Sequence, residues 1–211
     1  MTESTGIISV LSPQDHRLEG SPEEIARNTA RLASIGHCIP EGEVRIVDDE
    51  DRDVPIGTVG EVVARGKKVM KGYWNKPQAS EETLRGGWLH TGDLASMDED
   101  GFLYLAGRKK DMIIRGGENI YPVEIENVLH GHPKVQESAV IGVPDEYWGE
   151  IVKAVIVLKP GETATAQEII DYCRERLASY KKPAMVEFVE ALPKNAMQKV
   201  LKNILRGETP Q

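Results

Sequence analysis

The hydrophobic pattern of the chain changes near residue 108, and that change constrains the fold more than any other feature. Before it, short apolar runs bounded by glycine, "GEVVARG" at 60–66 and "GFLYLAG" at 101–107, are typical of strands joined by turns. After it, apolar residues recur at helical spacing in "YPVEIENVLHGHP" and again in "TAQEIIDYCRERLASY". The sequence therefore predicts a β-rich unit followed by an α+β unit, with the boundary within residues 108–111.

The residues before the boundary, 1–107, are expected to form a small antiparallel β subdomain. The run "EVRIVD" at 43–48 alternates apolar and charged residues, as a strand with one buried face does. One helix is expected nearer the N-terminus. In "SPEEIARN" a capping serine is followed by proline and, three residues on, by a glutamate that can reach back to the cap.

The residues after the boundary, 108–211, are expected to form a compact α+β unit. Amphipathic helices are predicted at 121–133 and 165–180, and a short final helix at 199–206. Strands are predicted between them at 135–143, 150–161 and 184–190. About a hundred residues suffice to bury a separate core, so the fold class predicted for the whole chain is α+β.

The composition limits the classes of partner. The chain has 211 residues, 40% of them apolar and 28% charged, which is ordinary for a globular protein. Its net charge of −8 disfavours a general attraction to nucleic acid or anionic lipid, so an anionic ligand would need local cations. No apolar run approaches the roughly 20 residues that span a bilayer, and the N-terminus does not read as a secretion signal. Cys38 and Cys173 are expected to be reduced thiols, and the protein is expected to be cytoplasmic.

Two ionic residues, Asp93 and Arg108, are the first candidates for a binding site. Asp93 ends the turn-like run "TGD", where a carboxylate could accept two parallel hydrogen bonds from vicinal hydroxyls. Alternatively, Asp93 bonds its own backbone in an Asx turn. Arg108, between a glycine and "KKD", is more simply a surface residue, and Lys109, Lys110 and Asp111 are most simply a solvated turn.

Further candidates are a glycine pair and a lysine in the last third of the chain. Gly116 and Gly117 permit either close approach by a ligand or an ordinary tight turn after the apolar run "MII". Lys199 lies between a loop and an apolar helical run, where it could place a point charge on a phosphate or carboxylate. It could also be a solvated lysine.

The order of these motifs resembles that of one family. The segments are "MTEST", "GEVVARGKKVMKGYW", "GWLHTGDL", "GRKKDMIIRGGENIYPVEIE" and "LPKNAMQKVLKNILR". Together they resemble the adenylate-forming superfamily, which includes acyl-CoA synthetases, aryl-CoA ligases, luciferases and peptide-synthetase adenylation domains. The segment beginning "GRKKD" is most similar to the bacterial fatty-acyl and aryl-CoA ligase branch.

The resemblance implies a C-terminal part of a longer enzyme. The phosphate-binding loop of the family is not found in the sequence. Residues 1–107 would correspond to the end of the large N-terminal adenylation domain, and 108–211 to the mobile C-terminal domain. The parent would be an acid–thiol ligase that uses ATP, Mg²⁺ and CoA to activate a carboxylic acid, and the isolated chain is expected to be inactive. Alternatives are a non-catalytic module that associates with itself or with a separate N-terminal partner, and a stand-alone adenylation domain.

The resemblance also implies roles for residues of the first unit and the boundary. Asp93 and Arg108 would hold the ribose of ATP. Thr2 and Glu3 would contact the α-phosphate, and Glu3 would also be a ligand of Mg²⁺. Lys110 would be the hinge about which the second unit swings.

In the second unit, Lys199 would bridge the substrate carboxylate and the α-phosphate during adenylation. Gly116 and Gly117 would form the loop beside which the pantetheine arm of CoA enters. The sequence departs from the family at Gln198, where relatives usually have glycine before the lysine. If that position needs a positive φ angle, glutamine there costs about a kcal/mol or more, or else the loop takes another shape.

Overall fold

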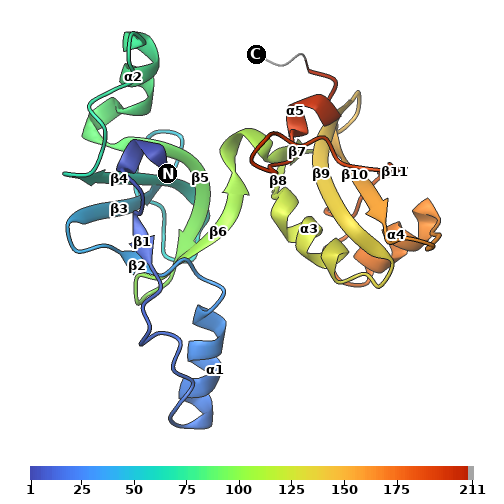
Figure 1. Ribbon diagram of the computed structural model, residues 1–211, viewed down its shortest axis with the longest axis horizontal. Helices are drawn as coiled ribbons and strands as arrows, with labels where there is room; N and C mark the ends of the chain where they lie inside the picture. The colour runs from blue at the N-terminus through green and yellow to red at the C-terminus, as the bar shows by residue number, and fades with distance from the viewer. Residues whose placement is uncertain (209–211) are drawn as a thin grey trace. The chain divides into compact units, whose positions relative to one another are not determined.

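The computed structural model describes residues 1–208 and divides the chain into two compact units, Met1–Lys109 and Lys110–Gln211 (Figure 1). The division at Lys109 and Lys110 lies inside the predicted boundary segment and two residues beyond the predicted end of the first unit. The reason is local: Arg108 still pairs as the last residue of a strand, and the Lys109 ammonium binds carboxylates of the first unit.

The first unit is built on an antiparallel sheet, as the sequence predicts. Its strands are, in spatial order, β3 (Gly42–Val47), β4 (Gly60–Gly66), β5 (Leu89–Met97) and β6 (Leu103–Arg108). One face of the sheet buries Ile46, Val62, Ala95 and Leu103. β5 runs through the "TGD" that the sequence presents as a turn, and this difference decides how the site is built.

Smaller elements flank this sheet. They are η1 (Thr2–Ser4), β1 (Ser9–Val10) paired with β2 (His37–Cys38), α1 (Pro22–Arg31), α2 (Pro77–Thr83) and η2 (Arg85–Gly87). The short η3 (Lys109–Asp111) spans the division between the two units. The predicted capping box of α1 is confirmed. The Glu24 amide donates to Ser21 Oγ at 3.3 Å, and the Ser21 amide donates to the Glu24 carboxylate at 2.7 Å.

The second unit has its own sheet and core. Its strands are β7 (Ile113–Arg115), β8 (Glu118–Ile120), β9 (Val135–Asp145), β10 (Gly149–Leu158) and β11 (Met185–Phe188). β10 pairs antiparallel with β9 along its length and parallel with β11 over four residues. Its helices are α3 (Pro122–His130), α4 (Ala166–Arg174) and α5 (Lys202–Leu205). This arrangement confirms the α+β class.

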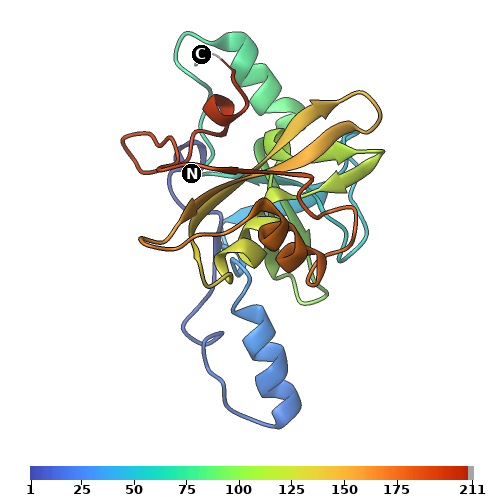
Figure 2. The same ribbon diagram turned by 90° about the vertical axis from the view of Figure 1, so that its right-hand side faces the viewer.

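Alternation along the two long strands of this unit places cores on both faces of its sheet (Figures 1 and 2). Val140, Val152 and Ile156 pack with α3 and α4, whereas Val155 packs with Leu192 and the segment that carries α5. Each buried aliphatic side chain contributes about 1.5–3 kcal/mol relative to exposure.

Two helices of the second unit are shorter than the sequence predicts. α4 ends at Arg174 rather than at residue 180, although the amides of Glu175 and Leu177 still donate to the carbonyls of Asp171 and Cys173. α5 begins at Lys202 rather than at Lys199, because Val200 bridges to Lys194 and the Leu201 amide donates to the Pro193 carbonyl at 2.8 Å. Within residues 1–208, no helix is long and apolar enough to cross a bilayer.

The two cysteine thiols lie in different units and are both unpaired with sulfur. Burial raises the pKa of Cys173 to about 11. It also raises the pKa of Cys38, and the negative charge of Glu43 adds to that rise. Since the thiolate is the reactive form, both groups are expected to be slow nucleophiles at neutral pH.

We expect the folded protein to react with a thiol reagent such as DTNB at Cys38 slowly and at Cys173 only after unfolding, because Cys173 is fully buried. The measurement is the time course of thiol release at pH 7.5, with and without guanidinium, with Cys38→Ser as the control. Rapid reaction of the Cys38→Ser variant in native buffer would contradict this packing.

Candidate functional site

A bulge in β5 shapes the site of the first unit. Glu61 of β4 lies opposite Leu94, and Val63 lies opposite His90, so that three residues of β5 face Val62 alone. Such bulges re-aim side chains and are frequent beside binding sites. The three bulged residues are Thr91, Gly92 and Asp93.

Two features hold the bulge in shape. The buried Thr91 hydroxyl donates to the Val62 carbonyl at 2.7 Å and accepts from the Asp93 amide at 3.1 Å. Gly92 adopts a φ of +68°, in the left-handed region that glycine enters without a steric cost. The hydroxyl of Thr91 therefore closes the turn, in place of the Asx turn that was the alternative for Asp93.

Asp93 and Arg108, which the sequence places fifteen residues apart, come together as a pair. They are register partners on β5 and β6, and Arg108 Nε lies 2.7 Å from Asp93 Oδ1. The Asp93 side chain is 29% exposed and that of Arg108 50% exposed, so solvent or a ligand can reach both. Burial raises the pKa of the Asp93 carboxyl; the Arg108 charge opposes that rise, and the charge of Glu3 adds to it.

The N-terminal candidates lie in the same unit. Glu3 is in η1, where its carbonyl accepts from the Met70 amide at 2.7 Å and its carboxylate accepts from the Tyr73 hydroxyl at 3.1 Å. Thr2 begins the same turn. Tyr73 was not singled out from the sequence, although it belongs to the segment "KGYW" that carries part of the resemblance.

The basic run after Arg108 is not a solvated turn. Lys109 Nζ lies 3.1 Å from the carboxylate of Glu61, a side chain 5% exposed, and 2.7 Å from that of Asp49. Asp111 pairs with Arg206 at 2.9 Å within the second unit. Lys110 between them is exposed and is the first residue of the second unit. The expectation of a solvated turn is therefore wrong for two of the three residues, because it could not foresee their distant carboxylate and guanidinium partners.

Gly116 and Gly117 form the two-residue turn between β7 and β8, with φ angles of +59° and +87°. Turns of this kind need positive φ at both positions, which explains the glycine pair. A Cβ on Gly116 would also lie 2.8 Å from the Trp148 ring, and the Gly116 amide donates to the Trp148 carbonyl at 2.8 Å. The interpretation as a tight turn is confirmed, and approach by a ligand stays a prediction. The close neighbour of Gly116 in the structure is Trp148, a residue that sequence reasoning missed.

Lys199 lies in a tight loop closed by Asn195. The Asn195 amide donates to the Lys199 carbonyl at 2.9 Å. The Asn195 side-chain oxygen accepts from the amides of Met197 and Lys199, each at 3.0 Å. Lys199 itself is exposed, so the loop presents its ammonium to solvent.

Gln198 takes a φ of +63° in this loop. The glutamine therefore adopts the left-handed conformation that glycine would adopt, and the loop does not take another shape to avoid it. A non-glycine residue there costs roughly 1–2 kcal/mol.

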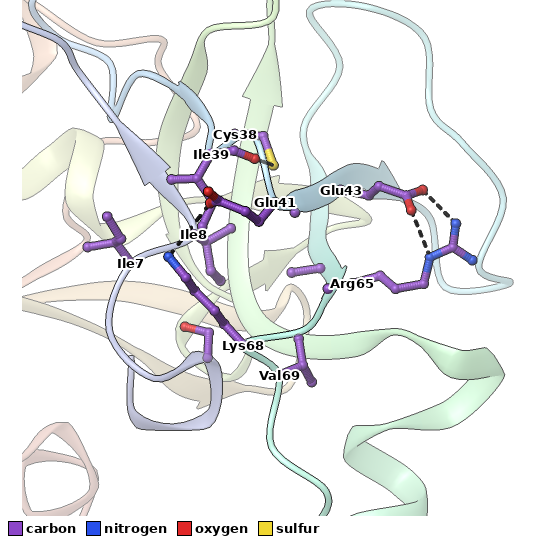
Figure 3. A pocket seen from close by; sticks show the side chains of 13 residues that line it. Ile7, Ile8, Cys38, Ile39, Glu41, Glu43, Arg65, Lys68 and Val69 are labelled. Atoms are coloured by element: carbon purple, nitrogen blue, oxygen red, sulfur yellow. Dashed lines mark hydrogen bonds and ion pairs between the residues drawn. The ribbon is translucent and has the colours of Figure 1, made fainter.

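A separate hollow lies under the N-terminal segment (Figure 3). Its walls are mainly apolar and include Ile7, Ile39 and Cys38, whose thiol donates to the Ile39 carbonyl at 3.4 Å. The charged groups at this hollow pair with each other, Arg65 with Glu43 and Lys68 with Glu41. The apolar walls of this hollow pack around the N-terminal segment, and its charged groups are already paired with each other, so it is a poor candidate for a catalytic site. Among residues 1–208, no group of three or more metal-binding side chains comes together.

Comparison with known proteins identifies the relatives of this chain. Family models described as AMP-binding enzyme and as AMP-binding enzyme C-terminal domain match residues 1–74 and 124–199. The chain is 48% identical to a long-chain-fatty-acid–CoA ligase of Escherichia coli over 83% of its own length and 31% of that protein. It is 41% identical to the 2-succinylbenzoate–CoA ligase of Geobacillus kaustophilus over its whole length and 40% of that protein. The chain thus spans about a third of the length of such relatives.

The fold matches a solved relative equally well. The o-succinylbenzoate CoA synthetase of Bacillus subtilis, bound to its acyl-adenylate intermediate, superposes with a TM-score of 0.86 and 40% identity, over 98% of this chain and 40% of that one. The same enzyme has also been solved with ATP and magnesium, with a TM-score of 0.83.

We expect Gln198→Val to lower the free energy of unfolding by about 1–3 kcal/mol, because a β-branched residue is poorly tolerated at positive φ. Gln198→Gly should equal or exceed the wild type by up to about 1 kcal/mol, since relief of the left-handed conformation is partly offset by chain entropy. Urea unfolding monitored by tryptophan fluorescence measures both. Equal stability of the valine and glycine variants would show that this residue is not held at positive φ.

Proposed function

The chain belongs to the AMP-binding, adenylate-forming enzyme family and matches its C-terminal portion, and from that premise we propose that it supplies two parts of the active site of an acyl-CoA synthetase. These are Asp93 and Arg108, which would hold the ribose of ATP and are called the ribose grip below, and Lys199, the lysine of the adenylation step. The reaction is two steps. A carboxylate attacks the α-phosphate of ATP and releases pyrophosphate, and the thiol of CoA then attacks the acyl-adenylate and releases AMP. The observation that carries the proposal is the Asp93–Arg108 pair at 2.7 Å beside the β5 bulge.

The pair suits a ribose because its groups have complementary roles. An ionised carboxylate offers two oxygens to the vicinal hydroxyls of the sugar. Arg108 keeps a positive charge beside that carboxylate and thereby favours its ionised form. It can also donate to the sugar from the nitrogens of its fork. Asp93 and Arg108 would therefore orient the nucleotide so that its α-phosphate faces the attacking acid.

The first step brings two anions together, and cations must screen their repulsion. Lys199 would place its ammonium between the carboxylate and the α-phosphate. A bound Mg²⁺ would supply further positive charge at the phosphates; such ions are often held by one or two carboxylates together with phosphates. Glu3, whose carboxylate is oriented by Tyr73, fits that requirement, and the Thr2 hydroxyl would donate to the α-phosphate.

The second step needs access for the thiol arm of CoA. We place the hinge at Lys110, which is exposed and begins the second compact unit. An exposed residue between two compact units can change its backbone angles without disturbing either core. The turn at Gly116 and Gly117 would lie along the path of the pantetheine arm. The first unit would correspond to the end of the large domain of relatives, and the second to their mobile domain.

The acid substrate is proposed to be a fatty or aryl carboxylic acid, from the names of the relatives, in a cytoplasmic setting. The chain alone is proposed to be inactive, since it spans about a third of such relatives. A second candidate is a module that self-associates. The exposure of Trp74 at 89%, Ile56 at 65% and Ile7 at 56% favours it, and light scattering would distinguish a monomer from an assembly.

A chimera tests the proposed role of Lys199. In it, this chain replaces the matching C-terminal region of the Bacillus subtilis o-succinylbenzoate CoA synthetase. We expect pyrophosphate release from ATP and o-succinylbenzoate, and a decrease of about 10²–10³-fold in that rate for Lys199→Ala, as for loss of one group that stabilises transition-state charge. The measurement is a coupled pyrophosphate assay.

Met197→Ala is the matched control, because Met197 is 75% exposed in the same loop and carries no charge. Its rate should stay within about twofold of the parent chimera. An active chimera that keeps its rate in Lys199→Ala would refute the role of Lys199. Turnover by the isolated 211-residue chain would refute its proposed inactivity.

A further inference from the structure

Glu61 is a carboxylate buried inside the first sheet. It lies on β4 and is only 5% exposed, although a buried charge is costly unless it is paired and hydrogen-bonded. Its two oxygens have different partners. Oε1 accepts from the Gly92 amide at 3.1 Å, and Oε2 accepts from the Lys109 ammonium at 3.1 Å. Burial by itself would raise the pKa of Glu61, but Lys109 and the Gly92 amide more than offset it and leave the pKa lowered.

The positions of these two partners are what make Glu61 informative. Gly92 directly precedes Asp93, and Lys109 directly follows Arg108. One buried side chain therefore binds a chain neighbour of each member of the Asp93–Arg108 pair, through the backbone amide at Gly92 and through the side-chain ammonium at Lys109.

Regular strand pairing is interrupted on both sides of Asp93 and cannot hold this residue in position by itself. The β4–β5 pairing is interrupted between Glu61 and Val63. The β5–β6 pairing shifts register again immediately after Leu94. Asp93 thus lies between two irregularities, where side-chain bonds must replace the missing backbone ones.

Three more polar side chains complete the surroundings of Glu61. Arg85 Nη2 lies 3.9 Å and His90 Nδ1 lies 3.5 Å from Oε2. Asp49 shares the Lys109 ammonium, at 2.7 Å, from the exposed side. These contacts lie on the Lys109 side of the carboxylate, so the bond to Gly92 rests on Oε1 alone.

We propose that Glu61 is a positioning residue for the ribose grip, fixing the β5 bulge through Gly92 and the end of β6 through Lys109. The role in ribose binding rests on the proposed function, whereas the positioning of Asp93 and Arg108 by Glu61 can be tested in this chain without a nucleotide. A buried ion pair with a purely structural role would affect the stability of the whole unit. If Glu61 is a positioning residue, its loss disturbs the Asp93–Arg108 pair more than it disturbs the rest of the unit.

The test uses the 211-residue chain and NMR hydrogen exchange. The variant Glu61→Gln retains the size of the side chain and removes its charge. We expect at least tenfold faster exchange of the Gly92 amide and of the Arg108 Nε–H. Amides in the sheet core, such as Ala95 and Leu103, should change less than threefold.

Two further variants keep the test decisive. Lys109→Met removes the ammonium partner of Glu61, and Lys109 is half-exposed, so the substitution leaves the core intact. We expect it to accelerate hydrogen exchange of the Arg108 Nε–H more than that of the Gly92 amide. Glu43→Gln is the matched control, because Glu43 is exposed on β3 and pairs with Arg65 outside the site; it should change neither signal. Uniform acceleration of all amides in Glu61→Gln, or no change at Gly92 and Arg108, would overturn the proposal.

Titration with AMP separates this inference from the proposed function. If AMP shifts the Asp93 and Arg108 signals of the wild type, we expect at least fivefold weaker binding by Glu61→Gln. Equal binding by the two proteins would overturn the positioning role of Glu61 and leave the proposed ribose binding by Asp93 and Arg108 intact. If AMP shifts neither signal in the wild type, the ribose grip loses its support in this chain, and the exchange rates alone decide on Glu61.

Discussion

The bulge in β5 is the constraint on which the site depends. A regular strand would alternate its side chains between the two faces of the sheet and keep every backbone group in the ladder. By setting Thr91, Gly92 and Asp93 opposite one residue of β4, the chain turns a carboxylate out of the ladder toward its register partner on β6. The backbone groups that lose ladder partners are bonded by side chains instead.

The second unit is built differently, and under the proposed function it would present Lys199 on a small loop closed by Asn195. Its long strands β9 and β10 carry cores on both faces, so that α5 and the loop before it pack on a sheet already covered by α3 and α4. The side-chain oxygen of Asn195 then closes the loop by accepting hydrogen bonds from two backbone amides. Gln198 in the left-handed region indicates that this geometry is kept at some cost in stability.

Much of the fold could be predicted from the sequence because its signals are local. The Ser21 capping box, the glycine-bounded strands and the apolar stripes of α3 and α4 each depend on residues a few positions apart. The ends of α4 and α5 could not be predicted as well. α5 starts late because the Leu201 amide bonds the Pro193 carbonyl, which competes with helical bonding, whereas α4 ends gradually, with the Leu177 amide still bonded to the Cys173 carbonyl.

The site shows the same division. The motifs indicated Asp93, Arg108, Gly116 and Lys199, but not the more distant residues beside them, such as Trp148 at Gly116 and Glu61 at Gly92 and Lys109. Lys109 was taken for a surface residue because Glu61 lies 48 residues before it. Glu61 of "GEVVARG" was not singled out from the sequence, and the structure shows it buried opposite the β5 bulge.

The most direct test of the central claim compares ATP with 2′,3′-dideoxy-ATP as substrates of the chimera. The claim is that Asp93 and Arg108 hold the ribose hydroxyls. The account predicts that loss of both hydroxyls lowers kcat/KM by about tenfold or more in the parent chimera. In Asp93→Asn the same loss should have a much smaller effect, because the charge-assisted bonds are already gone. An equal ratio in the two proteins would contradict the account.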